Sequence, residues 1–151
     1  MTLKEVLTEA LDDEYKARAM YRKVIDQFGP VRPFVNIVEA EERHIAVLLP
    51  LFGKYRIAPP KDKWTQIVRV SDTVLEACQA GVDAEIENIA MYDRLLAAVQ
   101  EEDVVRVLTN LQSASRERHL PAFRRCVKRG GCAPGGGGGE NMSAGRNRAG
   151  E

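Results

Sequence analysis

The sequence has few cysteines, no surplus of charge of either sign and no long run of apolar residues. Three cysteines are too few, and odd in number, for a disulfide-stabilised scaffold. Lysine plus arginine and aspartate plus glutamate each total 22, so the chain has no basic field to gather nucleic acid. No apolar run approaches the ~18–20 residues that span a bilayer. We therefore expect neither a nucleic-acid partner nor a membrane.

The first residues also lack the features of an export signal. The segment MTLKEVLTEALDDE carries charges where a signal peptide needs an apolar stretch. The expected location is therefore the cytoplasm.

Glycine is scarce in most of the chain and abundant at its end. Nine of the twelve glycines lie in residues 130–151. The residues before them are numerous enough to bury a core of ordinary size. The composition predicts one domain over residues 1–129 and a disordered Gly-rich tail over residues 130–151.

Four long helices are predicted within the domain, because apolar residues recur there at steps of three and four. The segments cover about residues 2–28, 32–52, 71–100 and 102–129. Pro121 is expected to bend the last of them just after His119, because it removes a backbone donor.

The connections between these helices indicate how they are arranged. Short turns join the first helix to the second and the third to the fourth, which favours antiparallel pairs. Residues 54–70 contain Pro59-Pro60, which excludes a helix, and can reach roughly 55 Å when extended. A helix of 24 residues is only ~36 Å long. The predicted fold is all-α, a four-helix bundle of two antiparallel hairpins joined by a long crossover.

The two predicted hairpins resemble each other in sequence. The first helix contains Glu14, four further residues and then Ala-Met-Tyr21, and the third contains Glu85, four residues and Ala-Met-Tyr92. The second and fourth helices share Glu-Arg-His, ending at His44 and at His119. This internal repeat suggests a pair of hairpins related by a two-fold axis.

Acidic and imidazole side chains fall on the apolar rows of these helices. Buried charge is costly unless it is paired or bound to a cation. Carboxylates together with imidazoles suit iron, manganese or zinc. The predicted metal ligands, whose side-chain tips should converge within roughly 6–7 Å, are Glu14, Glu41, His44, Glu85 and His119.

These residues resemble the ferritin-like superfamily, in which two helices each give a Glu and the other two each give Glu-x-x-His. The Glu-x6-Tyr spacing is similar to the rubrerythrin-type branch. The phrases FGPVRPFVNIVEAEERH, AGVDAEIENIAMYDRLL and SASRERHLPAF resemble an uncharacterised bacterial ferritin-like domain family. The resemblance covers about residues 2–128 and implies a di-iron carboxylate site.

The implied activity is that of an iron-dependent oxidoreductase, which oxidises Fe(II) or reduces oxygen or peroxide, or else simple iron binding. Because the chain has no Cys-x-x-Cys pair for a rubredoxin-like centre, electrons would come from an external donor. The expected assembly is a monomer or a small homo-oligomer.

The fourth helix departs from the family pattern, because Arg116 stands where the motif requires Glu. Its guanidinium is expected to contact Glu85 or Glu117, so one metal ion or an asymmetric pair is as consistent with the sequence as two. Tyr21 and Tyr92 are expected to pack beside the site with their hydroxyls bonded to a neighbouring acid. The alternative hypothesis is a metal-free structural or interaction bundle whose acids pair with Arg18 and Arg116.

Two cysteines are predicted to be neighbours in the core. Cys78 lies seven residues before Glu85, and Cys126 lies seven residues after His119. In antiparallel helices both sulfurs then lie at one level, ~10.5 Å from the metal layer. The favoured interpretation is a pair of thiols in a reducing cytoplasm. The alternatives are a disulfide or a soft-metal site that includes Cys132.

Overall fold

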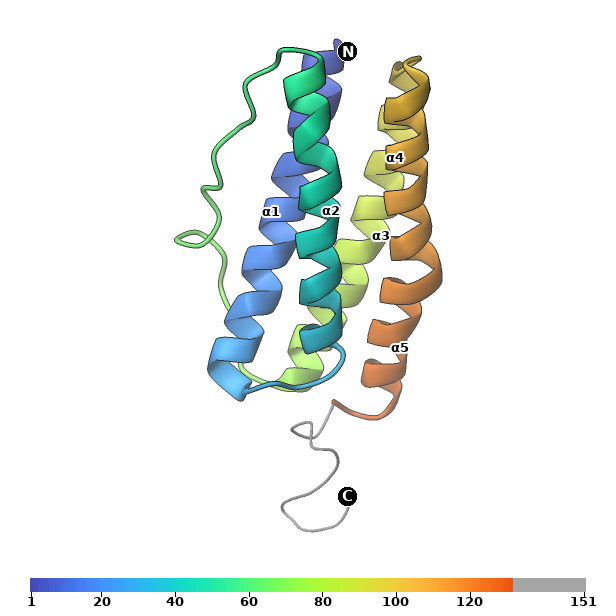
Figure 1. Cartoon of the computed structure of the whole chain (residues 1–151). Helices are drawn as coiled ribbons and strands as arrows, with labels where there is room; N and C mark the ends of the chain where they lie inside the picture. The colour runs from blue at the N-terminus through green and yellow to red at the C-terminus, as the bar shows by residue number, and fades with distance from the viewer. Residues whose placement is uncertain (132–151) are drawn as a thin grey trace.

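The computed structural model describes residues 1–131, and their regular structure is helical throughout (Figure 1). The helices are α1 (Leu3–Phe28), α2 (Phe34–Lys54), α3 (Val74–Ala98), α4 (Glu102–Ala114), the π-helix η1 (Ser115–His119) and α5 (Leu120–Lys128). The last three follow one another directly and form one long fourth helix. The predicted all-α four-helix bundle is confirmed. Most of the predicted Gly-rich tail, residues 132–151, lies outside the described residues.

The chain runs as two antiparallel hairpins. Figure 1 shows α1 beside α2 and α3 beside the fourth helix, with the crossover returning along the full length of the bundle past α1. Side chains hold this crossover against α1. The Trp64 indole Nε1–H donates to Asp12 at 3.0 Å, and Arg18 donates to Asp62 at 3.0 Å. None of the described helices combines the length and the apolar character needed to cross a membrane.

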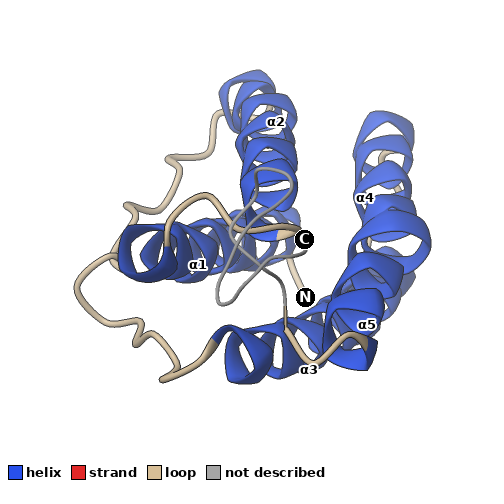
Figure 2. Ribbon diagram, turned by 90° about the horizontal axis from the view of Figure 1, so that it is seen from below, coloured by secondary structure: helices blue, strands red, loops and turns tan. Residues whose placement is uncertain are grey.

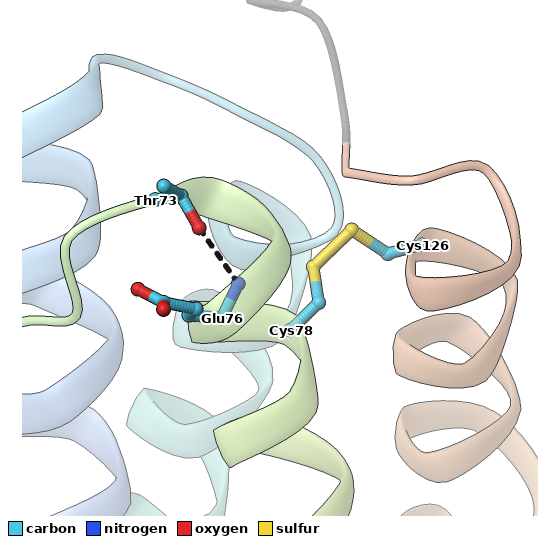
Figure 3. The surroundings of a disulfide bond; sticks show 4 residues. All are labelled: Thr73, Glu76, Cys78 and Cys126. Atoms are coloured by element: carbon cyan, nitrogen blue, oxygen red, sulfur yellow. Dashed lines mark hydrogen bonds between the residues drawn. A yellow bond between two sulfur atoms is a disulfide. The ribbon is translucent and has the colours of Figure 1, made fainter.

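Local signals in the sequence set the ends of the helices. Thr2 and Glu5 form a capping box at the start of α1, and the Thr73 hydroxyl accepts from the Glu76 amide at 3.1 Å at the start of α3 (Figure 3). Helix α1 ends at Gly29, whose φ of 86° is a conformation that favours glycine.

The fourth helix contains a wider turn just before Pro121. The Leu120 amide donates to the Ser115 carbonyl, five residues back, as in a π-helix. Pro121 has no amide hydrogen, and its ring would clash with the carbonyl four residues earlier in a regular α-helix. Pro121 predicts a bend just after His119, and the irregularity that the structure has beside this proline is a π-turn that ends at His119.

The buried apolar side chains form two clusters at different levels of the bundle. One cluster includes Leu7, Leu48 and Leu108, and the other includes Phe34 and Phe123. Along each helix the buried polar residues fall between the positions that belong to the two clusters. The bundle therefore encloses a polar layer between two apolar ones.

A disulfide joins Cys78 to Cys126 and so links α3 to α5 (Figure 3). Their Cα atoms are 6.1 Å apart, within the range that the bond requires. The predicted proximity is confirmed, whereas the favoured interpretation as two thiols is wrong. Cys132 lies outside the described residues.

Removing the disulfide should destabilise the bundle. The bond closes a segment of 48 residues, for which the chain-entropy estimate is about 4 kcal/mol. The double variant Cys78→Ala, Cys126→Ala should therefore unfold at a lower temperature than the oxidised protein in a calorimetric scan. The wild type held in reductant should shift in the same direction. Equal unfolding temperatures for all three samples would contradict this prediction.

Gly81 of α3 lies against Phe123, so a side chain at this position would disrupt the packing there. A Cβ at this position would lie 2.7 Å from ring carbons of Phe123, too close for any real contact. Gly81→Ala should therefore destabilise the protein by about 1–3 kcal/mol in denaturant unfolding. Gly53→Ala is the matched control, since a Cβ there meets nothing within 4 Å. The control should be neutral or stabilising by up to about 1 kcal/mol, through helix propensity. A stable Gly81→Ala variant would show that Phe123 can move.

Candidate metal centre

All five predicted ligands are buried in the polar layer, and none has more than 8% of its whole-residue surface exposed. Each of the four long helices contributes at least one of them: Glu14 comes from α1, Glu41 and His44 from α2, Glu85 from α3, and His119 from the end of η1. They form two groups, Glu14–Glu41–His44 and Glu41–Glu85–His119. In each group, one ligand atom per residue lies within 4.8 Å of the others. Glu41 therefore belongs to both groups.

In the first group one imidazole nitrogen faces two carboxylates. His44 Nδ1 lies 3.1 Å from Glu14 Oε1 and 3.0 Å from Glu41 Oε1. The second oxygen of Glu14 accepts a hydrogen bond from the Tyr92 hydroxyl at 2.6 Å. The inner oxygen of each acid is thus directed toward the histidine.

The second group is looser, and several of its polar atoms have no partner. His119 Nδ1 lies 3.5 Å from Glu85 Oε1 and 3.9 Å from Glu41 Oε2. Glu85 Oε1 and both ring nitrogens of His119 are buried without a hydrogen bond to any described residue. An unsatisfied buried polar group costs ~1–3 kcal/mol, so such groups call for an explanation. A cation between Glu85 Oε1 and one ring nitrogen of His119 would satisfy those two atoms.

The two tyrosines of the sequence repeat support the site crosswise. Tyr21 of α1 donates to Glu85 Oε2 of α3 at 2.7 Å, while Tyr92 of α3 donates to Glu14 of α1. The expectation that their hydroxyls bond a neighbouring acid is confirmed. Burial, and then the nearby carboxylates, raises the pKa of both phenols well above the usual value. Both therefore act as neutral donors that hold the outer oxygen of each acid.

The pKa values of Glu41 and Glu14 are shifted in opposite directions in the metal-free protein. Burial raises the pKa of the Glu41 carboxyl well above its usual range, and the charge of Glu14 adds to the rise. Burial acts on Glu14 in the same sense, but the hydrogen bond and charge of His44 outweigh it and lower the pKa of Glu14. Without a cation, Glu41 is the acid that takes up a proton.

The expectation that Arg18 and Arg116 pair with the buried acids is wrong. Arg116 is exposed, and the neighbouring Ser115, seven residues after Leu108 on the inward row, is buried instead. In the described part of the chain Arg116 forms no ion pair with Glu85 or Glu117. Arg18 pairs with Glu42 at 2.8 Å and with Asp62, both outside the polar layer.

A chain of hydrogen bonds beside the site escaped the sequence analysis. Ser115 Oγ donates to Asn88 Oδ1 at 2.7 Å, and Asn88 Nδ2 donates to Asp13 Oδ2 at 2.6 Å. Burial raises the pKa of Asp13 to about 6, although the bond from Asn88 opposes the rise. Asn88 lies on the inward row of α3, which is the signal that could have found it. Ser115 lies seven residues after Leu108 and four after Leu111, so the inward row of α4 is the signal that could have found it.

Comparison with known proteins gives relatives without an assigned activity. The uncharacterized protein MJ0754 of Methanocaldococcus jannaschii is 27% identical over 139 residues, which cover 82% of this chain and 74% of that protein. The crystal structure of MJ0754 matches with a TM-score of 0.74, covering 85% of this chain and 81% of that one. A hypothetical protein from Pyrococcus furiosus, 22% identical, shares the fold with a TM-score of 0.67 over 85% of this chain and 89% of that one.

A protein-family model matches most of the chain. Residues 4–134 fit the family described as an uncharacterized protein domain, DUF2202. The chain belongs to the DUF2202 family.

Proposed function

We propose that this protein is a ferritin-like metal-binding protein that holds iron between its four helices. The observation that carries the proposal is the set of buried atoms without partners, Glu85 Oε1 and both ring nitrogens of His119. These atoms lie in the same layer as the Glu14–Glu41–His44 group. The proposed ligands are the five residues predicted from the sequence: Glu14, Glu41, His44, Glu85 and His119.

The donor set supports a transition metal. Carboxylate oxygens and imidazole nitrogens together suit iron, manganese and zinc. Iron is favoured because the Glu-x6-Tyr helices resemble the rubrerythrin-type branch. Glu41 belongs to both groups, so in this proposal it would serve two ions or complete the shell of one.

The surrounding residues would prepare this site for redox chemistry. Bound iron would supply the electrons that reduce oxygen or peroxide, with Fe(II) itself or an external donor as the reductant. Tyr21 and Tyr92 hold the outer oxygens of Glu85 and Glu14, which leaves the inner oxygens for a cation. The two apolar clusters separate the polar layer from the ends of the bundle. In this role the protein is an iron-dependent oxidoreductase.

One observation favours a metal-free structural bundle as the second candidate. The raised pKa of Glu41, caused by its burial, lets a proton replace a cation there. This candidate no longer relies on Arg18 or Arg116, which lie elsewhere. It does not account for the unpartnered nitrogens of His119.

Glu41→Gln should abolish metal binding, because it removes the carboxylate that both groups share. Protein purified without chelator or metal-affinity tag should contain iron, manganese or zinc by elemental analysis, and the variant should contain little. Glu42→Gln is the matched control, since Glu42 pairs with Arg18 at the surface. This control variant should retain the metal.

Metal binding should also stabilise the wild type. At a free Fe²⁺ concentration of 100 times Kd under argon, the gain is about 2.7 kcal/mol. Wild-type protein that contains no metal, and unfolds at the same temperature with and without Fe²⁺, would instead support the metal-free bundle.

Tyr21→Phe and Tyr92→Phe should each weaken metal binding by about 10–100-fold, because a ligand carboxylate loses the hydrogen bond that orients it. Competition with a chromogenic chelator measures this change. Tyr55→Phe is the matched control, since the Tyr55 hydroxyl donates to Asp103, outside the proposed ligand set. An equal loss in the control, or none in the two site variants, would mean that the tyrosines only pack.

A further inference from the structure

A groove of about 290 Å³ lies between α2 and the fourth helix, on a side of the bundle that the crossover does not cover (Figure 2). Its walls combine polar side chains, including Asn110, with apolar ones, which include Ala40 and Val47 of α2 and Leu111 and Ala114 of α4. This volume lies at the lower end of the range for small-molecule sites. The groove therefore suits a compact ligand rather than a macromolecule.

The groove reaches the polar layer at His44, which forms part of its wall. His44 Nδ1 faces Glu14 and Glu41, and the same residue also lines the groove. The His44 side chain is 10% exposed, whereas that of His119 is 4% exposed. A ligand in the groove would thus lie against the more accessible imidazole of the site.

The charged groups that line the groove are both cationic and lack acidic partners. Arg43 and Arg118 are exposed, and neither forms an ion pair within the described chain. No acidic side chain lines the groove in the part that the structure describes. Guanidinium groups bind carboxylates through paired hydrogen bonds.

We propose that this groove binds a small organic acid, a carboxylate on a short apolar body. Arg43 and Arg118 would hold the carboxylate, and Val47, Leu111 and Ala114 would contact the apolar part. The apolar residues of the groove favour such an acid over an inorganic anion, because an inorganic anion would leave those residues exposed to water. The proposal goes beyond metal binding, because the groove and both arginines exist without a metal.

Octanoate is a suitable probe of this site. Isothermal titration calorimetry of the full chain as purified should give a Kd of about 1 mM or tighter. The double variant Arg43→Gln, Arg118→Gln should bind at least ~10-fold more weakly, a loss of about 1.4 kcal/mol. Arg106→Gln is the matched control, since Arg106 is an exposed arginine of α4 that does not line the groove. Its affinity should equal that of the wild type.

Two further ligands separate the contributions of charge and apolar contact. Octan-1-ol, which lacks the charge, and inorganic phosphate, which lacks the apolar body, should each bind at least ~10-fold more weakly than octanoate. Equal affinity for phosphate, equal affinity for octanol, or unchanged octanoate binding in the double variant would overturn the proposal. Repeating the titration after dialysis against EDTA should leave octanoate binding in place. The groove is then tested whether or not a metal binds.

Discussion

The central physical constraint on this protein is the burial of three glutamates and two histidines inside an apolar bundle. Carboxylates in such a place need protons, hydrogen-bond donors or a cation to balance them. The structure supplies His44 to Glu14 and a tyrosine hydroxyl to each of Glu14 and Glu85. Within residues 1–131 no hydrogen bond reaches the inner oxygen of Glu85, which has His119 Nδ1 3.5 Å away. The two apolar layers on either side of the acids hold the helices together around this unsatisfied oxygen.

Much of the fold and of the site followed from local regularities. Helical periodicity repeats every few residues, so positions seven apart, such as Leu7, Glu14 and Tyr21, could be assigned to one buried row. The same spacing placed Cys78 opposite Cys126. Their oxidation state did not follow, because proximity alone does not distinguish a pair of thiols from a bond.

The errors concern the positions and partners of the two arginines, Arg116 and Arg18. The Glu-x-x-His motif aligns Arg116 with Glu41, but Arg116 is exposed, whereas Ser115 on the inward row of α4 is buried. Arg18 finds its partners on α2 and on the crossover, whose path no periodicity describes. Sequence reasoning thus identified the buried acids and their tyrosine donors, but not the partners of Arg18 or the hydrogen-bond chain from Ser115 through Asn88 to Asp13.

The crossed tyrosine bonds make the two halves of the chain interdependent. A hairpin of α1 and α2 alone would retain Glu14 and Tyr21 but lose the hydroxyl that Glu14 needs, because that hydroxyl comes from α3. The hairpin that begins with α3 would lose the donor to Glu85 in the same way. Two copies of one hairpin could exchange both bonds only across a symmetric dimer. The internal repeat therefore encodes, within one chain, an exchange that separate hairpins would have to make between molecules.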